Sequence, residues 1–298
     1  MTIVSYKYLV ISKVPFRGFK SKCLSFLILL HFVLSPCFSQ EDKPERLSYR
    51  STMFGLGKAN VYDSYLSPLN YLGNSYSLME ESMGMTGLSN GNMAFQQLFN
   101  IDFSSTNNMA GNSPQYTGFL EYSYGLFYRL APMPKLKVFA GSQINGLAGF
   151  IYNVRNSNNP ATGKAHINLA LSAAASYGFN IKSQPFRLRY QISSPFAGFM
   201  FSQHFGQSYY EISLGDNDNL VHFSSYHNQV ILRNNLSLEI PFNFMTFRLM
   251  YAHSFYETRI NYIDTRIRNN SFMIGFSREF FNIPGKKPVK GKFKRVFE

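Results

Sequence analysis

A histidine and a serine two positions apart, His222 and Ser224, form the sharpest catalytic arrangement in the sequence. A two-residue step in a β-strand brings both side chains to one face, where the histidine could act as general base for a serine nucleophile. No acidic residue is clearly paired with them. The adjacent His253 and Ser254 would point to opposite faces of a strand. We therefore predict that no residue is catalytic, and a hydrolase acting on lipid or peptide stays the alternative function.

Acidic residues and histidines also gather in the segment Leu214–His222, which contains Asp216 and Asp218 and follows His204. Such side chains at an exposed rim could bind a metal ion or form an aspartate–histidine protease centre. The run that begins at Asp216 starts like a calcium loop, but Val221 occupies the position where that loop needs glycine. We expect a solvated loop here and predict no metal site.

Neither a nucleotide site nor a nucleic-acid surface is indicated. The run Gly55-Leu56-Gly57 lacks the third glycine of a nucleotide-binding fingerprint, because position 60 is Asn. The formal net charge of +13 is concentrated at the ends of the chain, with five basic residues before Cys23 and six in the last thirteen positions. Between these ends the chain is weakly basic. We predict no cofactor and no nucleic-acid partner.

The first 39 residues have the layout of a secretory signal peptide. A basic segment precedes an apolar run over Cys23–Leu34, and a short stretch of small and polar residues follows. Cleavage is predicted after Ser39. A lipoprotein with Cys37 as the lipidated residue is the weaker alternative, because Pro36 occupies a position where a small residue is expected. The apolar run is too short for a retained helical anchor, since a bilayer span needs about 20 residues.

Cleavage after residue 39 removes both cysteines of the sequence. Secreted soluble domains often use disulfide bonds, so a chain without them favours a fold that is held together in another way. No segment of the mature chain has eighteen uninterrupted apolar residues, which excludes helical membrane spans.

The segment Ala165–Ile181 is the clearest structural signal. Its odd positions are mainly apolar and its even positions are small and mostly polar over seventeen residues, so an extended strand would have one greasy face. A strand that crosses hydrocarbon at a steep tilt needs at least about 9 to 11 residues of such alternation. The alanine-rich part, Ile167–Gly178, could alternatively be a helix, but the neighbouring segments offer no matching helical face.

Similar alternation recurs along the chain, and the polar faces include Glu121, Arg129, Arg233 and Glu239. Charges on such a face suit a wet or internally paired lumen and not a dry core. Ten strands are predicted, with eight or twelve as alternatives because the first two alternate poorly. They are Ser48–Lys58, Tyr71–Gly84, Asn92–Ser104, Gln115–Leu130, Leu136–Asn153, Lys164–Ile181, Phe186–Phe201, Val221–Ile240, Phe244–Tyr256 and Arg268–Phe281.

Short proline-marked turns and longer polar connections alternate between these strands, which is the asymmetry of an outer-membrane barrel. The sequence therefore predicts an all-β fold, a single antiparallel transmembrane β-barrel over residues 40–284, and a basic periplasmic tail over 285–298. An exported soluble β-protein is the alternative. The predicted short turns are Ala131–Lys135, Lys182–Pro185 and Pro241–Asn243, and the predicted long connections are Ser105–Pro114, Val154–Gly163, Ser202–Leu220 and Glu257–Ile267.

The stretch Phe54–Met85, FGLGKANVYDSYLSPLNYLGNSYSLMEESMGM, resembles the opening of an uncharacterised family of Bacteroidetes outer-membrane β-barrel proteins, classed as a domain of unknown function. Its distinctive features are the Gly55-Leu56-Gly57 run and the later Ser67-Pro68-Leu69 run. The remainder of the mature chain matches mainly in barrel character. The resemblance implies an exported, membrane-inserted barrel, and it implies no activity, ligand or catalytic residue.

The predicted function is that of a non-enzymatic outer-membrane barrel of unknown specific role, with a narrow lumen or loops that interact with envelope ligands or small solutes. At about ten strands the lumen should be largely filled by side chains. The expected partners are outer-membrane lipids and, during biogenesis, the barrel assembly machinery, for which Phe276, Phe280 and Phe281 in the last strand look like a recognition signal. The expected location is the outer membrane, after secretion to the periplasm.

Overall fold

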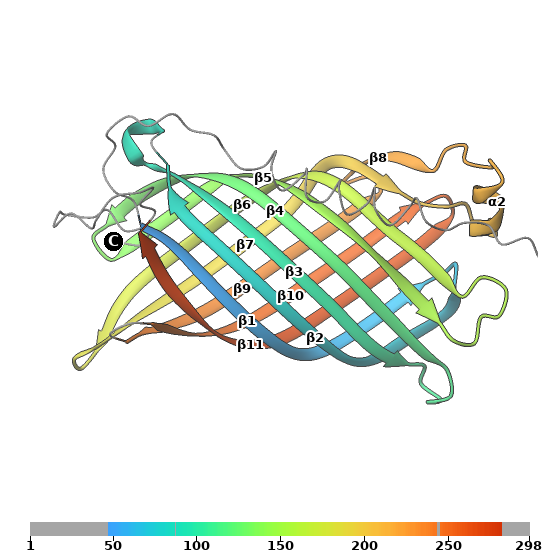
Figure 1. Cartoon of the computed structure of the whole chain (residues 1–298), viewed down its shortest axis with the longest axis horizontal. Coiled ribbons are helices and arrows are strands. Elements are labelled where there is room, and N and C mark those ends of the chain that lie inside the picture. Colours follow the sequence, from blue (N-terminus) through green and yellow to red (C-terminus); the bar gives the residue numbers. More distant parts are fainter. Residues whose placement is uncertain (1–46, 87, 243–244, 282–298) are drawn as a thin grey trace, which may run out of the picture. The chain divides into compact units, whose positions relative to one another are not determined.

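The computed structural model describes residues 47–86, 88–242 and 245–281 (Figure 1). The predicted signal peptide and the predicted basic tail lie outside these ranges. None of the helices within them has the length and apolar character needed to cross a bilayer. The elements are β1 (Leu47–Asp63), β2 (Ser67–Met85), the 3-10 turn η1 (Ser89–Gly91), β3 (Met93–Asn107), β4 (Pro114–Met133), β5 (Leu136–Asn153), β6 (Ala161–Ile181), β7 (Gln184–Phe201), α2 (Tyr209–Ser213), β8 (Val221–Ser225), β9 (Gln229–Pro241), β10 (Thr246–Ile260) and β11 (Ile263–Phe281).

The strands form one antiparallel sheet that closes on itself. The order is β6-β5-β4-β3-β2-β1-β11-β10-β9-β7, and the pairing of β6 with β7 completes the ring. Leu47 pairs with Phe281 at one end, which we call the base; the end that carries residues 202–220 is the loop end. Each of the ten strands of the ring is paired on both sides, as a sheet that crosses lipid requires, and the short β8 pairs with β7 alone. The predicted single antiparallel barrel is confirmed.

The ring has ten wall positions, because β8 and β9 both pair with β7 and share one position. The predicted strand Val221–Ile240 is therefore interrupted at Tyr226–Asn228. The Asn228 side chain accepts a hydrogen bond from the Ser225 amide at 3.0 Å, and the Asn228 amide donates to the Ser225 carbonyl at 3.1 Å. This local turn competes with the sheet ladder, as asparagine side chains commonly do.

One predicted connection is wrong. The segment Glu257–Ile267 is not a long loop, since β10 continues to Ile260 and β11 begins at Ile263. Only Asn261 and Tyr262 join them, both with positive φ, 52° and 60°. Such a two-residue turn matches the twist of the strands it connects. The other predicted turns and loops each overlap a gap between strands, although Ser105–Asn107, Ala131–Met133 and Ala161–Gly163 belong to β3, β4 and β6.

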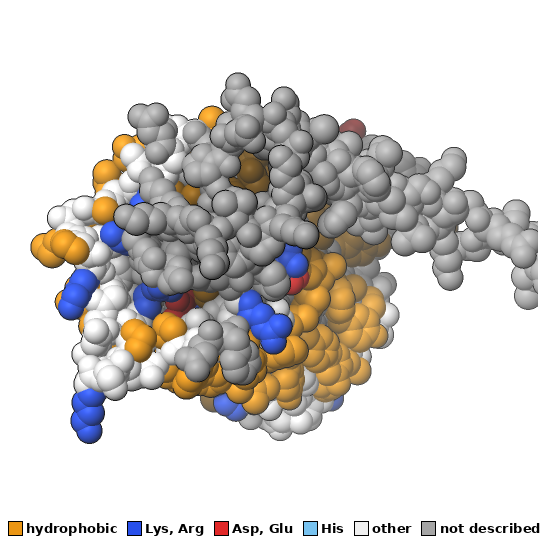
Figure 2. Space-filling model, turned by 60° about the vertical axis from the view of Figure 1, so that its left-hand side comes forward, with side chains coloured by type: hydrophobic (Ala, Val, Ile, Leu, Met, Phe, Trp, Pro, Cys, Tyr) orange, Lys and Arg blue, Asp and Glu red, His pale blue; other side chains and the backbone are white. Residues whose placement is uncertain are grey.

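Side chains alternate between the two faces of the wall as predicted. On β6, Ile167 and Leu171 point outward and are 67% and 58% exposed, whereas His166 and Asn168 point inward and are buried. The helical alternative for this segment is therefore wrong. Figure 2 shows apolar side chains forming a broad area of the outer surface. An apolar outer face around a polar interior is typical of a β-barrel that is embedded in a lipid bilayer.

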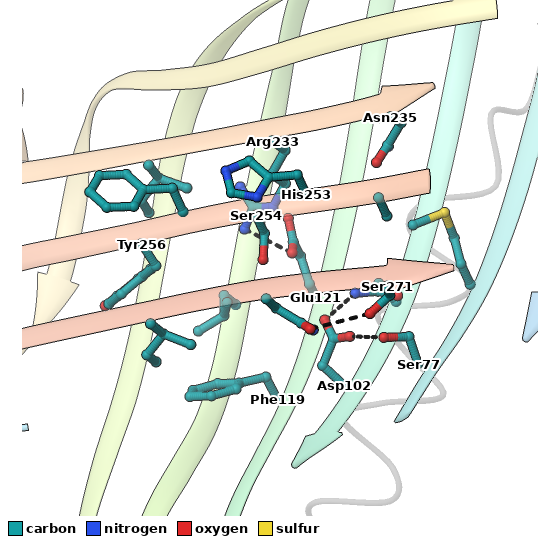
Figure 3. A pocket seen from close by; sticks show the side chains of 18 of the residues that line it. Ser77, Asp102, Phe119, Glu121, Arg233, Asn235, His253, Ser254, Tyr256 and Ser271 are labelled. Atoms are coloured by element: carbon teal, nitrogen blue, oxygen red, sulfur yellow. Dashed lines mark hydrogen bonds and ion pairs between the residues drawn. The ribbon is translucent and has the colours of Figure 1, made fainter. Parts of the chain in front are cut away.

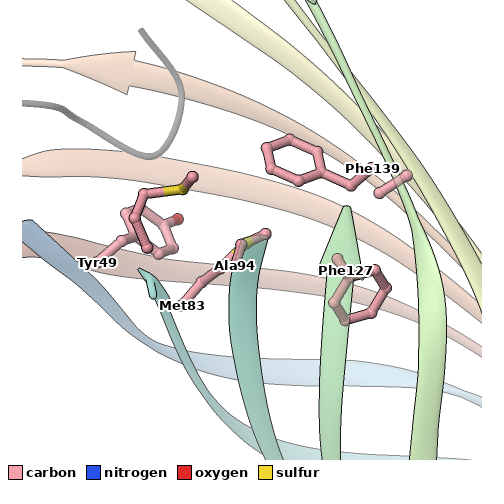
Figure 4. Close-up of a cluster of buried hydrophobic side chains, with 7 residues drawn as sticks. Tyr49, Met83, Ala94, Phe127 and Phe139 are labelled. Atoms are coloured by element: carbon pink, nitrogen blue, oxygen red, sulfur yellow. The ribbon is translucent and has the colours of Figure 1, made fainter. Parts of the chain in front are cut away.

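Apolar side chains pack inside the wall near both ends. The cluster at the base (Figure 4) draws on six consecutive strands, and it consists of Tyr49, Met83, Met85, Ala94, Phe127, Phe139 and Ala174. The cluster at the loop end consists of Ala59, Val61, Tyr65, Leu66, Ile151 and Ile263. Polar and charged side chains fill much of the lumen between these two clusters.

Candidate functional site

Buried charges cross the lumen next to the base cluster. Glu81 on β2 contacts Arg189 on β7 and Arg248 on β10, with N···O separations of 2.7 and 2.5 Å. Since β2 and β7 stand half a turn apart in the ring, the Glu81–Arg189 pair joins opposite walls. Glu239 pairs with Arg187 at 3.1 Å in the same layer. We call these five residues the basal ion-pair layer; it holds three positive and two negative side chains.

Two further ion pairs bridge the lumen towards the loop end. Glu121 on β4 lies 2.8 Å from Arg233 on β9. Beyond it, Asp63 on β1 lies 2.8 Å from Lys164 on β6, again from opposite walls, and Lys164 also donates to Thr265. Buried pairs of this kind are costly to break, because the remaining charge loses its partner in a poorly solvated place.

A cavity of about 110 Å³ lies between the basal layer and the Asp63–Lys164 pair (Figure 3). One part of its wall is apolar and another part is polar, and the methionines Met79 and Met273 line the side nearest the base. The apolar part includes Phe119, Leu147, Ile231, Tyr256 and Ile267; the polar part includes Ser77, Asn100, Asp102, Glu121, Arg233, Asn235, Asn269 and Ser271.

Asp102 is the acidic group of this cavity that has no ion-pair partner among the described residues. Its carboxylate accepts hydrogen bonds from Ser77 Oγ at 2.5 Å and from Asn100 Nδ2. Asn100 is 8% exposed, and no donor within the described ranges reaches its Oδ1. Glu121, by contrast, is matched by Arg233. The cavity therefore combines one uncompensated negative charge with an apolar wall.

The structure describes both histidine–serine pairs that the sequence singles out. His222 and Ser224 share the inward face of β8, as their spacing predicts, but Ser224 Oγ donates to Asn168 Oδ1 at 3.2 Å. No hydrogen bond joins His222 to Ser224 in the described part of the chain. His253 and Ser254 point to opposite faces of β10; His253 Nδ1 lies 2.8 Å from Asn270 Oδ1.

The acidic loop segment makes its contacts through the main chain. Asp216 and Asp218 are exposed, and their carbonyl oxygens lie within hydrogen-bond distance of Gln207 Nε2 (2.8 Å) and His204 Nε2 (3.2 Å). Among the described residues, no group of three or more His, Cys, Asp and Glu side chains could hold a metal ion.

The glycine run in β1 has a packing role. A Cβ at Gly57 would lie 2.1 Å from the carbonyl oxygen of Asn270, and one at Gly55 would lie 2.7 Å from Met273 Cγ. Both glycines therefore let β11 or its side chains approach β1 closely, which is a common reason for glycine inside a strand.

The 202–220 loop, which contains α2 (Figure 1), is bonded to two other connections and to strand β6 at the loop end. Tyr65 Oη donates to the Gln207 carbonyl at 2.6 Å, and Asn261 Nδ2 donates to the Ser202 carbonyl at 3.0 Å. The Gly163 amide donates to Tyr209 Oη. Burial raises the pKa of the Tyr65 phenol to about 12, and negative charge at neighbouring groups adds to the effect.

Sequence reasoning found part of this site. Glu121 and Arg233 were expected on polar faces suited to an internally paired lumen, and they do pair across it. Asp102, Asn100 and Ser77 were missed. Asn100 and Asp102 share one face of β3, and only the register of β2 with β3 places Ser77 opposite Asp102. A lone acid on an inward face was the signal that could have pointed to Asp102.

Comparison with known proteins identifies a family. A family model described as "Protein of unknown function (DUF3316)" matches residues 24–287. No curated protein matches the chain. Similar solved structures include the outer membrane protease OmpT from Escherichia coli, at 9% identity over 81% of this chain and 99% of that chain, with a TM-score of 0.47. The transport unit of the autotransporter AIDA-I from Escherichia coli has 9% identity over 86% and 96% (TM-score 0.40), and an outer membrane channel from Pseudomonas putida F1 has 7% identity over 83% and 100% (TM-score 0.36).

Proposed function

Since the chain belongs to the DUF3316 family, whose function is unknown, we propose its role from the chemistry of its lumen. The protein is an outer-membrane barrel that binds a small solute in its central cavity and does not conduct in its resting state. The observation that supports this role is the position of the cavity between the Glu81–Arg189 pair and the Asp63–Lys164 pair, each of which joins opposite walls.

The ion pairs argue against an open pore. The side chains of Glu81, Arg189, Asp63 and Lys164 are each at most 5% exposed, so they are packed and not lining a water-filled channel. A ring of ten strands leaves a narrow interior that side chains can fill. The space that is left is a chamber, and a chamber with convergent polar groups and an apolar wall has the character of a ligand site.

We also propose that the barrel reaches the outer membrane after secretion to the periplasm. The apolar outer face supports contact with outer-membrane lipids. The predicted signal peptide and the aromatic residues of β11 support export and handling by the barrel assembly machinery. This proposal assigns no reaction to the cavity.

Conductance of the refolded protein in planar lipid bilayers tests the closed lumen. We expect no discrete openings, because charged pairs occupy the lumen at three levels. Regular conductance steps from the wild-type protein would contradict the resting closed state. The solute-binding part needs a separate measurement, because a closed barrel could also be an inert one.

Fluorine NMR can measure binding with three probes of one shape, 4-fluorobenzylamine, 4-fluorobenzyl alcohol and 4-fluorobenzoate. We expect saturable binding of at least one probe and its loss in Ala252→Phe, since Ala252 lines the cavity and a ring there would fill it. Leu249→Phe on the outer face of the same strand is the matched control. If none of the three probes binds, solute binding is wrong.

A further inference from the structure

The charges that face the central cavity narrow the class of solute, an inference that rests on the proposed binding function. The acidic and basic residues that line the cavity are Asp102, Glu121, Arg233 and His253. The Nδ1 atom of His253 lies within hydrogen-bond distance of Asn270 Oδ1, at 2.8 Å. Glu121 and Arg233 compensate each other at 2.8 Å. Asp102 has no cationic partner within the described part of the protein, so one negative charge is left facing the space.

The hydrogen-bonding groups beside Asp102 also favour a solute that is positively charged and rich in donors. Its carboxylate receives one bond from Ser77 and one from Asn100, which leaves lone-pair capacity on both oxygens. The Oδ1 atom of Asn100 receives no bond from the described residues. A buried acceptor without a donor is unfavourable, so this corner favours a guest that brings donors. A primary ammonium group brings three donors and no acceptor.

The apolar part of the cavity wall limits the chemistry of the rest of the solute. Phe119 on β4 is the cross-strand neighbour of Asp102, and Tyr256 lies farther from Asp102 (Figure 3). Ile231 and other apolar residues complete that part of the wall. A second charged group placed there would lose its hydration without a partner. A calcium ion is a poor fit as well, because it takes about six to eight oxygen ligands.

We propose that the central cavity binds a small organic monocation, a primary amine with one apolar substituent. The ammonium group lies against Asp102 and the Asn100 carbonyl oxygen. The substituent lies against Phe119 and Tyr256, whose ring faces also attract a nearby cation.

The three fluorinated probes test the class directly. We expect 4-fluorobenzylamine to bind the wild-type barrel at least tenfold more tightly than 4-fluorobenzyl alcohol, and 4-fluorobenzoate to bind more weakly than either. Asp102→Asn keeps the size of the side chain and removes its charge, so it should abolish the preference for the amine over the alcohol. Glu257→Gln, an outward carboxylate on β10, should leave all three affinities unchanged.

The outcomes separate this inference from the proposed function. Equal binding of amine and alcohol, with loss of both in Ala252→Phe, would overturn the amine preference and leave solute binding standing. Tightest binding of 4-fluorobenzoate would also overturn the amine preference, because it would show that the cavity prefers an anion. No binding of any probe would remove the proposed function itself. Should Asp102→Asn fail to fold, the wild-type ratio of amine to alcohol decides alone, and a ratio below about two overturns the proposal.

Discussion

Arg189 Nη2 lies 2.7 Å from Glu81 Oε1 and ties β7 to β2, two strands on opposite walls of the barrel. Both side chains are almost fully buried. A buried ion pair contributes little net stability compared with apolar packing, yet it specifies which groups must meet. Here it holds two opposite walls at a fixed separation and closes the lumen on the base side of the central cavity.

Replacing Glu81 by glutamine should destabilise the barrel by about 3–5 kcal/mol, because Arg189 and Arg248 then share a buried layer with one fewer negative charge. Urea-dependent unfolding from lipid vesicles measures the change. Glu257→Gln is the matched control, since Glu257 pairs with Arg266 at 3.5 Å on the exposed surface and its loss should cost less than about 1 kcal/mol. Similar costs for both variants would contradict this view of the basal layer.

The strands could be predicted where one face of the wall is apolar. Lipid contact demands an apolar residue at every second position, and the predicted Leu136–Asn153 coincides with β5. Prediction failed towards the loop end, where β1 continues past Lys58 to Asp63. There the outward residues are polar, as Arg266 and Arg268 on β11 illustrate, so the alternation disappears although the ladder continues.

The site could be predicted only as single residues. The alternation placed Glu121 and Arg233 on polar faces, but their contact depends on how β4 and β9 face each other once β6 has paired with β7. That relationship follows from strand number and stagger around the whole ring, which no local pattern in the sequence contains. The cavity beside Asp102 is a product of the same closure.

Ser224→Ala should leave the turnover of phospholipid and of lipid A at the wild-type level. The reason is geometric, because Ser224 Oγ donates to Asn168 and no bond to His222 activates it as a nucleophile. Product release during incubation with each lipid measures this. A wild-type protein that hydrolyses either lipid, together with a Ser224→Ala variant that does not, would establish the hydrolase alternative instead.

Leu171→Arg should destabilise the barrel in bilayers by about 2–4 kcal/mol, the cost of a basic residue on the lipid-facing side near the middle of a membrane. Leu171 is 58% exposed and stands midway along β6. Tyr210→Arg is the control, since Tyr210 is 71% exposed on α2 at the loop end and its replacement should have little effect. Unfolding from vesicles measures both. If the two variants are equally stable, β6 does not face lipid.

Docking of the 202–220 loop should weaken at alkaline pH, because the Tyr65 phenol donates to the Gln207 carbonyl at 2.6 Å. Burial raises its pKa from 10 to about 12. When the loop is undocked, the phenol loses its proton above about pH 10, whereas the docked phenol keeps its proton up to about pH 12. The stabilisation is therefore fully present below about pH 10 and is lost as the pH rises through about 12. A spin label on Asp218→Cys should become more mobile over this range.

The assignment of that transition to Tyr65 depends on two matched tyrosine variants. In a chain that begins at residue 40, Asp218→Cys supplies the sole cysteine, so the label reports one position. Tyr65→Phe should raise the mobility of the label already at neutral pH and remove the alkaline step, because the variant has no phenol to ionise. Tyr210→Phe alters an exposed ring and should retain the step. An alkaline step of undiminished size in Tyr65→Phe would show that another group controls the loop, since only the Tyr65 bond was removed.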